Sequence, residues 1–191
     1  VPDSMHCNAP RFTLMYWSTV PRVSRPRGGK ERVRFCEAAH WSPLGNRIEG
    51  DGGYGSPISI ASDGMTVAIG APLIGTESNM FGNGLVEVFR FDGEANQWVP
   101  HGTSITGNAS GQRLGSAVSL SADFHVLVIG SPGASTDSVI KAGVVSIFEF
   151  DVQATDWYLI QQHKGRDSNA SLGWRSAISA SGDSLIIGVR G

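Results

Sequence analysis

The sequence contains few cysteines, no long apolar run and no strong excess of charge. Its two cysteines, Cys7 and Cys36, could form one disulfide, but they show no metal-binding spacing and do not fix the redox compartment. No stretch reaches the ~18 apolar residues that a membrane-spanning helix needs, so we expect no membrane insertion. A net charge of −2 gives no whole-chain attraction to nucleic acid, so we expect no nucleic-acid partner.

Residues 1–28 lack a clear periodicity and are basic. Prolines interrupt this segment, which carries Arg11, Arg22, Arg25 and Arg27. A basic arm, a transit peptide and a solvated irregular segment are the alternatives, and the composition favours the irregular segment. The chain starts with Val and shows no apolar signal core, which predicts a fragment or a processed product.

The dominant feature of the remaining chain is an internal repeat. Residues 55–70 read GSPISIASDGMTVAIG, and related stretches occupy 115–130 and 173–188. Each stretch begins and ends with glycines fifteen positions apart. Residues 84–98 also align without a gap onto 143–157. A fixed period of this kind indicates a repeat protein.

Tryptophans mark the same period. Trp41, Trp98 and Trp157 lie 57 and then 59 residues apart, which gives a unit of about 57–60 residues. Alternating or Val- and Phe-rich patterns predict four strands per unit. The predicted strands cover 56–61 and 116–121, 65–69 and 125–129, 85–91 and 144–150, and 98–105 and 157–163; another is expected at 31–35.

The first two strands of each unit are predicted to form an antiparallel hairpin. Asp63-Gly64 and Ser181-Gly182 stand at the link, where the sequence favours a type I′ turn. Asp123-Phe124 fits that turn less well.

An all-β fold follows, in which four-stranded antiparallel sheets bury their faces by stacking on one another. A β-propeller does this, whereas a β-sandwich would not need strands to recur in groups of four. We expect a partial propeller over 29–191, preceded by the irregular segment 1–28. It comprises outer strands of one blade at 29–50, blades at 53–107 and 113–166, and the start of a further blade at 172–191. The missing blades of the same propeller are therefore expected partners.

The motifs carry a family resemblance. Tyr54-Gly55 is followed by Gly70-Ala71-Pro72, and Leu114-Gly115 by Gly130-Ser131-Pro132. This pattern resembles the FG-GAP repeats of the integrin α-subunit propeller, and is still more similar to FG-GAP-like tandem repeats in secreted or surface proteins of microbes and algae. The third copy departs from it, with Gly188-Val189-Arg190.

The resemblance implies an extracellular or cell-surface propeller for adhesion. By likeness to integrins, a protein or glycan ligand would contact four loops, at 71–83, 131–142, 49–54 and 107–113. The sequons at Asn108 and Asn169 fit secretion. The alternatives are a propeller enzyme of the glycosidase or lyase type, with its catalytic residues in missing blades, and a structural spacer.

No catalytic, metal or cofactor site is predicted. The links at Asp63 and Asp123 are too short to wrap calcium, and the Asp92–Asn96 turn loses its ligands in its aligned partner at 151–155. The five histidines, His6, His40, His101, His125 and His163, show no metal or triad spacing. We interpret Ser59, Ser119 and Ser179 as small residues rather than nucleophiles, and the three tryptophans as packing anchors.

Overall fold

The computed structural model describes residues 12–14, 17–18, 42–75, 82–136 and 138–190. All regular structure in these ranges is β-strand, and every named strand pair is antiparallel. The predicted all-β class is therefore confirmed. Cys7, Cys36, Trp41, His6, His40 and the strand predicted at 31–35 lie outside the described residues.

The first sheet corresponds to the unit predicted at 53–107. Its strands are β5 (Ile58–Ile60), β6 (Thr66–Ala71), β7 (Leu85–Asp92), β8 (Gln97–Pro100) and β9 (Ile105–Thr106). The strands β5 to β8 follow one another in sheet order, and β9 also pairs with β7. The single strand predicted at 98–105 is thus two shorter strands, with Gly102 at a φ of 85° in the break between them.

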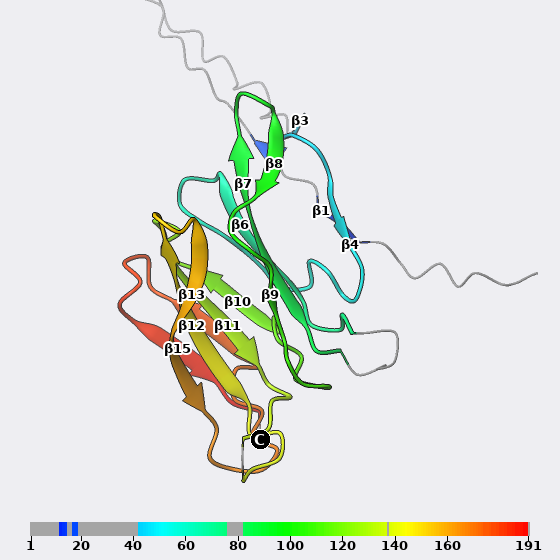
Figure 1. The fold of residues 1–191 in the computed structure, drawn as a ribbon, viewed down its shortest axis with the longest axis vertical. Helices are drawn as coiled ribbons and strands as arrows, with labels where there is room; N and C mark the ends of the chain where they lie inside the picture. The colour runs from blue at the N-terminus through cyan, green and yellow to red at the C-terminus, as the bar shows by residue number, and fades with distance from the viewer. Residues whose placement is uncertain (1–11, 15–16, 19–41, 76–81, 137, 191) are drawn as a thin grey trace, which may run out of the picture.

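The second sheet repeats this order without the break. It contains β10 (Ala117–Leu120), β11 (Val126–Ser131), β12 (Val144–Asp151) and β13 (Asp156–Lys164). A third, two-stranded sheet follows, formed by β14 (Arg175–Ile178) and β15 (Leu185–Gly188). Figure 1 shows the three sheets in chain order, from cyan and green through yellow to red, and β10 packs against both β5 and β14.

Four short strands precede the first sheet. β1 (Phe12–Leu14) pairs with β4 (Ile48–Gly50), and β2 (Trp17–Ser18) pairs with β3 (Ser42–Pro43). Two of them, β1 and β2, fall in the segment 1–28 that the sequence predicts to be irregular. Among the described residues no sheet closes on itself.

The predicted hairpins are present, but the predicted type I′ turn is wrong. That turn needs positive φ at both central residues, whereas only Gly64 of the Asp63-Gly64 pair has it, at 65°. Asp63 instead uses its carboxylate to accept hydrogen bonds from the backbone N–H groups of Met65 and Thr66, at 2.8 and 3.0 Å. This carboxylate therefore satisfies the turn without a left-handed aspartate.

The larger of two buried hydrophobic clusters lies between the first and second sheets, and the smaller one lies between the first sheet and the segment before it. Val118 and Leu120 of β10 are buried in the larger cluster, beside Val86 and Val88 of β7. The matching residues of the first sheet, Ile58 and Ile60, are 53% and 48% exposed. Burial of this face therefore depends on a preceding sheet, because β10 has one packed against it in the described structure and β5 does not.

The same hydrogen bonds join successive sheets at two junctions. Ser59 Oγ accepts a bond from Leu120 N, and Ser119 Oγ accepts one from Ile178 N, both at 3.0 Å. The residue at this position in the third copy is Ala177, which has no hydroxyl. The recurrent serines therefore link sheets that lie about sixty residues apart in the sequence.

The recurrent tryptophans also act between units. Trp98 and Trp157 are buried, and their indole Nε1–H groups donate to the backbone carbonyls of Leu44 and His101, at 3.0 and 2.9 Å. Each acceptor belongs to the segment that precedes the tryptophan's own sheet. The interpretation of Trp98 and Trp157 as packing anchors is therefore confirmed.

Candidate functional site

The four loops singled out by the sequence lie together at one end of the sheets. Backbone hydrogen bonds connect 49–54 to 71–83, 71–83 to 107–113, and 107–113 to 131–142. The donors and acceptors are Leu73 N to Gly52 O, Arg113 N to Gly82 O, and Gly133 N to Gln112 O, at 2.9 to 3.2 Å. Residues 76–81 of the loop 71–83 are not described.

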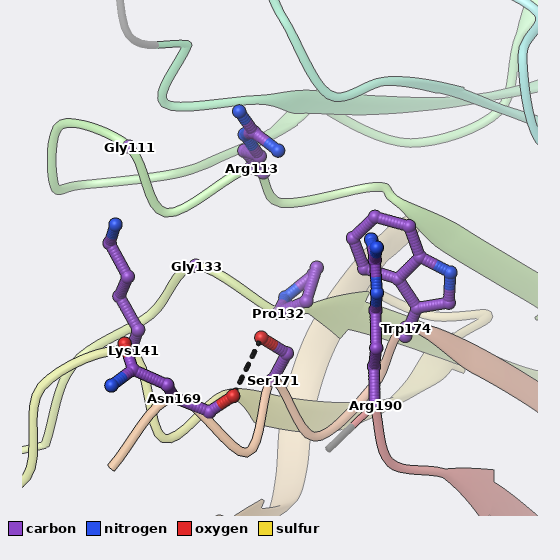
Figure 2. Close-up of a pocket in the computed structure, with 9 residues that line it drawn as sticks. All are labelled: Gly111, Arg113, Pro132, Gly133, Lys141, Asn169, Ser171, Trp174 and Arg190. Atoms are coloured by element: carbon purple, nitrogen blue, oxygen red, sulfur yellow. Dashed lines mark hydrogen bonds between the residues drawn. The ribbon is translucent and has the colours of Figure 1, made fainter.

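A pocket of about 360 Å³ opens at this end, between the second sheet and the third. Its lining comes from four segments: the connection before β10, the one between β11 and β12, the one between β13 and β14, and the residues after β15. It is lined by Gly111, Arg113, Pro132, Gly133, Lys141, Asn169, Ser171, Trp174 and Arg190, and we call it the cationic pocket. Figure 2 shows Lys141, Arg113 and Arg190 arranged around it, with Trp174 beside Arg190.

Backbone hydrogen bonds fix the loops that form the cationic pocket. Asn169 N donates to Ile140 O at 3.0 Å, and Ser171 N donates to Lys141 O at 3.2 Å. Arg190 N donates to Ala170 O at 3.1 Å. The floor of the pocket is therefore part of the hydrogen-bonded framework, although its long side chains are exposed.

The charge of the cationic pocket is of one sign. Arg113, Lys141 and Arg190 are its only charged lining residues. Within the described ranges, the one salt bridge joins Arg47 to Glu49, so none of these three cations is paired with a carboxylate there. The guanidinium of Arg190 stands 4.8 Å from the centre of the Trp174 ring. This arrangement can bind an anion and exclude a cation.

His101 and His125 lie at the junction between the first two sheets, away from the lining of the cationic pocket. His101 stacks on Phe150 at 4.0 Å between ring centres, and its buried Nε2 has no hydrogen-bond partner among the described residues. Desolvation, followed by the nearby charges of Arg90 and His125, lowers the pKa of His101 below its ordinary value. His163 is exposed on β13.

The aspartates considered as calcium ligands act in turns. The Asp92 carboxylate accepts backbone bonds from Glu94 and Ala95, at 2.9 and 3.1 Å. A 2.6 Å hydrogen bond from Ser121 Oγ lowers the pKa of Asp123. No group of three or more potential metal-ligating side chains occurs in the part of the chain that the structure describes.

The predicted glycosylation sequons differ in their surroundings. Asn108 is exposed in the connection before β10, away from the lining of the cationic pocket. Asn169 and Ser171 both line that pocket, and Ser171 Oγ donates to Asn169 O at 3.3 Å. A glycan on Asn169 would therefore share space with any ligand in the pocket.

Sequence reasoning did not identify the cationic pocket. Its cations come from three segments that are far apart in the sequence, so no local motif contains them. The signal that was available is departure from the repeat: Arg190 stands where the second copy has Pro132, and Trp174 where it has Ser116.

Among the described residues there is no helix of the length and apolar character that a membrane span requires. Compared with protein-family models, the chain matches none, and no curated protein sequence is significantly similar to it. The resemblance to FG-GAP repeats therefore stays a prediction from the sequence motifs.

Proposed function

We propose that residues 29–191 form part of a β-propeller, in which each four-stranded sheet is one blade. The observation that supports this most strongly is the repetition of the serine and tryptophan hydrogen bonds at successive junctions. Stacking by a repeated set of contacts is what a radial array of blades requires. The remaining blades of the same propeller are the partners that would cover Ile58 and Ile60.

The proposed role is noncatalytic interaction on the cell surface or outside the cell. The loops at 49–54, 71–83, 107–113 and 131–142 form the ligand face, because they are gathered at one end of a rigid set of sheets. The cationic pocket lies at this end, and its nine lining residues include no carboxyl group. That lining suits binding better than glycoside hydrolysis, which uses a pair of carboxylates.

The full chain, immobilised on a sensor surface, tests this function against an array of glycans and extracellular-matrix proteins. We expect retention of at least one ligand, with no release of reducing ends from a bound polysaccharide. Hydrolysis that a single Asp→Asn or Glu→Gln change abolishes would contradict the noncatalytic role. Retention of no ligand at all would contradict the interaction function.

A further inference from the structure

We infer that the cationic pocket binds a carboxylate- or sulfate-bearing sugar of an acidic polysaccharide. This rests on the proposed interaction function and names its ligand class. Three cations face one open cavity, and no carboxylate lines it. An anion entering the pocket would receive charge-assisted hydrogen bonds, and each arginine could hold a carboxylate or sulfate through two parallel N–H groups.

The backbone of the cationic pocket supports a binding role independently of its charge. Seven non-glycine residues of the described chain have positive φ, and four of them line this pocket. They are Arg113, Lys141, Asn169 and Ser171, with φ between 49° and 62°. Left-handed non-glycine residues cluster at functional sites, where the surrounding structure holds them in this conformation.

The repeat shows that two of these residues replace a glycine. Arg113 stands at the position of Gly53 in the first copy, where φ is 77°. Asn169 stands at the position of Gly111 in the second copy, where φ is 74°. Glycine adopts this conformation without steric cost, so folding alone does not favour arginine at position 113.

The neighbouring junction has left-handed residues at matching positions, but it lacks three of the side chains that line the cationic pocket. The counterparts of Lys141, Trp174 and Arg190 between the first and second sheets are Gly82, Ser116 and Pro132. Only the junction between the second and third sheets therefore combines an indole ring with several cations. A difference confined to one junction of a repeated framework is typical of a ligand site rather than of packing.

The form of the pocket favours a sugar over a peptide. Its lining residues belong to connections rather than to the strands, so an extended peptide has no strand edge in the pocket to pair with. A hydroxyl from Ser171, an amide from Asn169 and ring surface from Trp174 and Pro132 suit the polar edge and apolar face of a sugar ring. The volume of about 360 Å³ is small for a ligand pocket, which fits one or two units of a chain.

The test measures binding of the full chain to heparin, polygalacturonate, neutral dextran and polyglutamate by calorimetry. Heparin supplies sulfate and polygalacturonate supplies carboxylate, so the two arms distinguish the anionic group. We expect binding to at least one acidic polysaccharide, weakened at least tenfold between 50 and 200 mM salt as charge-dominated binding requires. Dextran and polyglutamate are expected to bind at least tenfold more weakly.

The decisive variant is Arg113→Gly, because it removes a cation and supplies the residue that the backbone prefers. We expect at least tenfold weaker polysaccharide binding with an unfolding midpoint equal to or above that of the unmodified chain. Arg166→Gln is the matched control, since Arg166 is an exposed cation on the connection before β14 that does not line the pocket. It should leave the affinity within about twofold.

Four outcomes would overturn the inference. Equal losses for Arg113→Gly and Arg166→Gln would show diffuse electrostatic attraction without a pocket. Preference for polyglutamate would assign the pocket to an acidic peptide. If the chain bound a neutral glycan or a protein, and Arg113→Gly did not weaken that binding, this ligand class would be rejected and the proposed interaction function would stand. If the chain bound nothing on the array, both would be rejected.

Discussion

At each of two junctions, a single serine hydroxyl accepts a backbone hydrogen bond from the next sheet. Ser59 and Ser119 make this bond, whereas Ser179 accepts one from Ser184 N inside its own turn. The recurring hydroxyl is therefore used as an acceptor between sheets. All three oxygens accept a backbone hydrogen bond, which is a structural use of the hydroxyl group.

Replacing Ser119 with alanine tests this role. The change leaves the N–H of Ile178 without its acceptor, so we expect the free energy of unfolding to fall by about 1 kcal/mol. Urea titration followed by tryptophan fluorescence measures it. Ser56→Ala is the control, since Ser56 is exposed and should change stability by less than about 0.5 kcal/mol. Equal losses for both variants would contradict the proposed acceptor role.

The stability of the chain should depend on pH through His101. Its pKa is lowered in the folded state, so the unfolded chain takes up a proton first as the pH falls. Stability is therefore fully present above the ordinary pKa of 6.5 and is lost as the pH falls through that value towards the folded pKa. The groups that act on His101 are Arg90, His125 and Asp63.

The expected measurement is a decrease in the unfolding midpoint between pH 7 and pH 5. His101→Phe keeps a ring against Phe150 and removes the titrating group, so it should flatten this decrease. His163→Phe is the control, because His163 is exposed on β13. If His101→Phe left the pH dependence unchanged, another group would be responsible.

At the scale of elements, the backbones of successive hairpins approach so closely that only glycine fits at the points of contact. A Cβ at Gly130 of β11 would meet the carbonyl oxygen of Gly173, and a Cβ at Gly70 of β6 would meet that of Gly115. The recurrent glycines thus allow each hairpin to lie directly on the next one.

Gly130→Ala is expected to destabilise the chain by about 1–3 kcal/mol, because backbone must shift to admit the methyl group. Gly93→Ala is the matched control, since nothing lies within 4 Å of its added Cβ. Thermal unfolding of the two variants compares them directly. A neutral Gly130→Ala would mean that the two hairpins are further apart than described.

The sequence predicted the strands well where they are long and regular. The predicted strands at 85–91 and 144–150 match β7 and β12 to within one residue, because Val and Phe fill both. The single strand predicted at 98–105 is two strands, β8 and β9, because Gly102 interrupts it. Both strands still pair with β7. The type I′ turn was wrong because Asp63 satisfies the turn through its side chain.

The site was harder to predict than the fold for a physical reason. Sequence periodicity identifies the residues that the copies have in common, whereas the cationic pocket is lined by residues that differ between the copies. Arg113, Lys141 and Arg190 meet only because loops far apart in the sequence are hydrogen-bonded at one end of the sheets.

For the molecule as a whole, equivalent positions have unequal surroundings. Leu120 and Ile60 occupy the same place in the repeat, yet Leu120 is 7% exposed and Ile60 is 48% exposed. Leu120→Ala should therefore cost about 2–5 kcal/mol. Ile60→Ala should cost about 1 kcal/mol, because only part of that side chain leaves water on folding.

Urea unfolding of the two variants in the full chain measures this difference. Trimming Ile186, which is 77% exposed on β15, provides a solvent-facing reference for the alanine change. Equal losses at positions 60 and 120 would show that another segment covers β5.

Because each junction is fastened only by its two adjoining sheets, damage at one of them is not transmitted along the series. A chain that loses the Ser119 acceptor keeps the Ser59 bond intact, so the 173–190 hairpin can detach while the earlier sheets remain associated. We therefore expect the described sheets to separate one junction at a time rather than all at once.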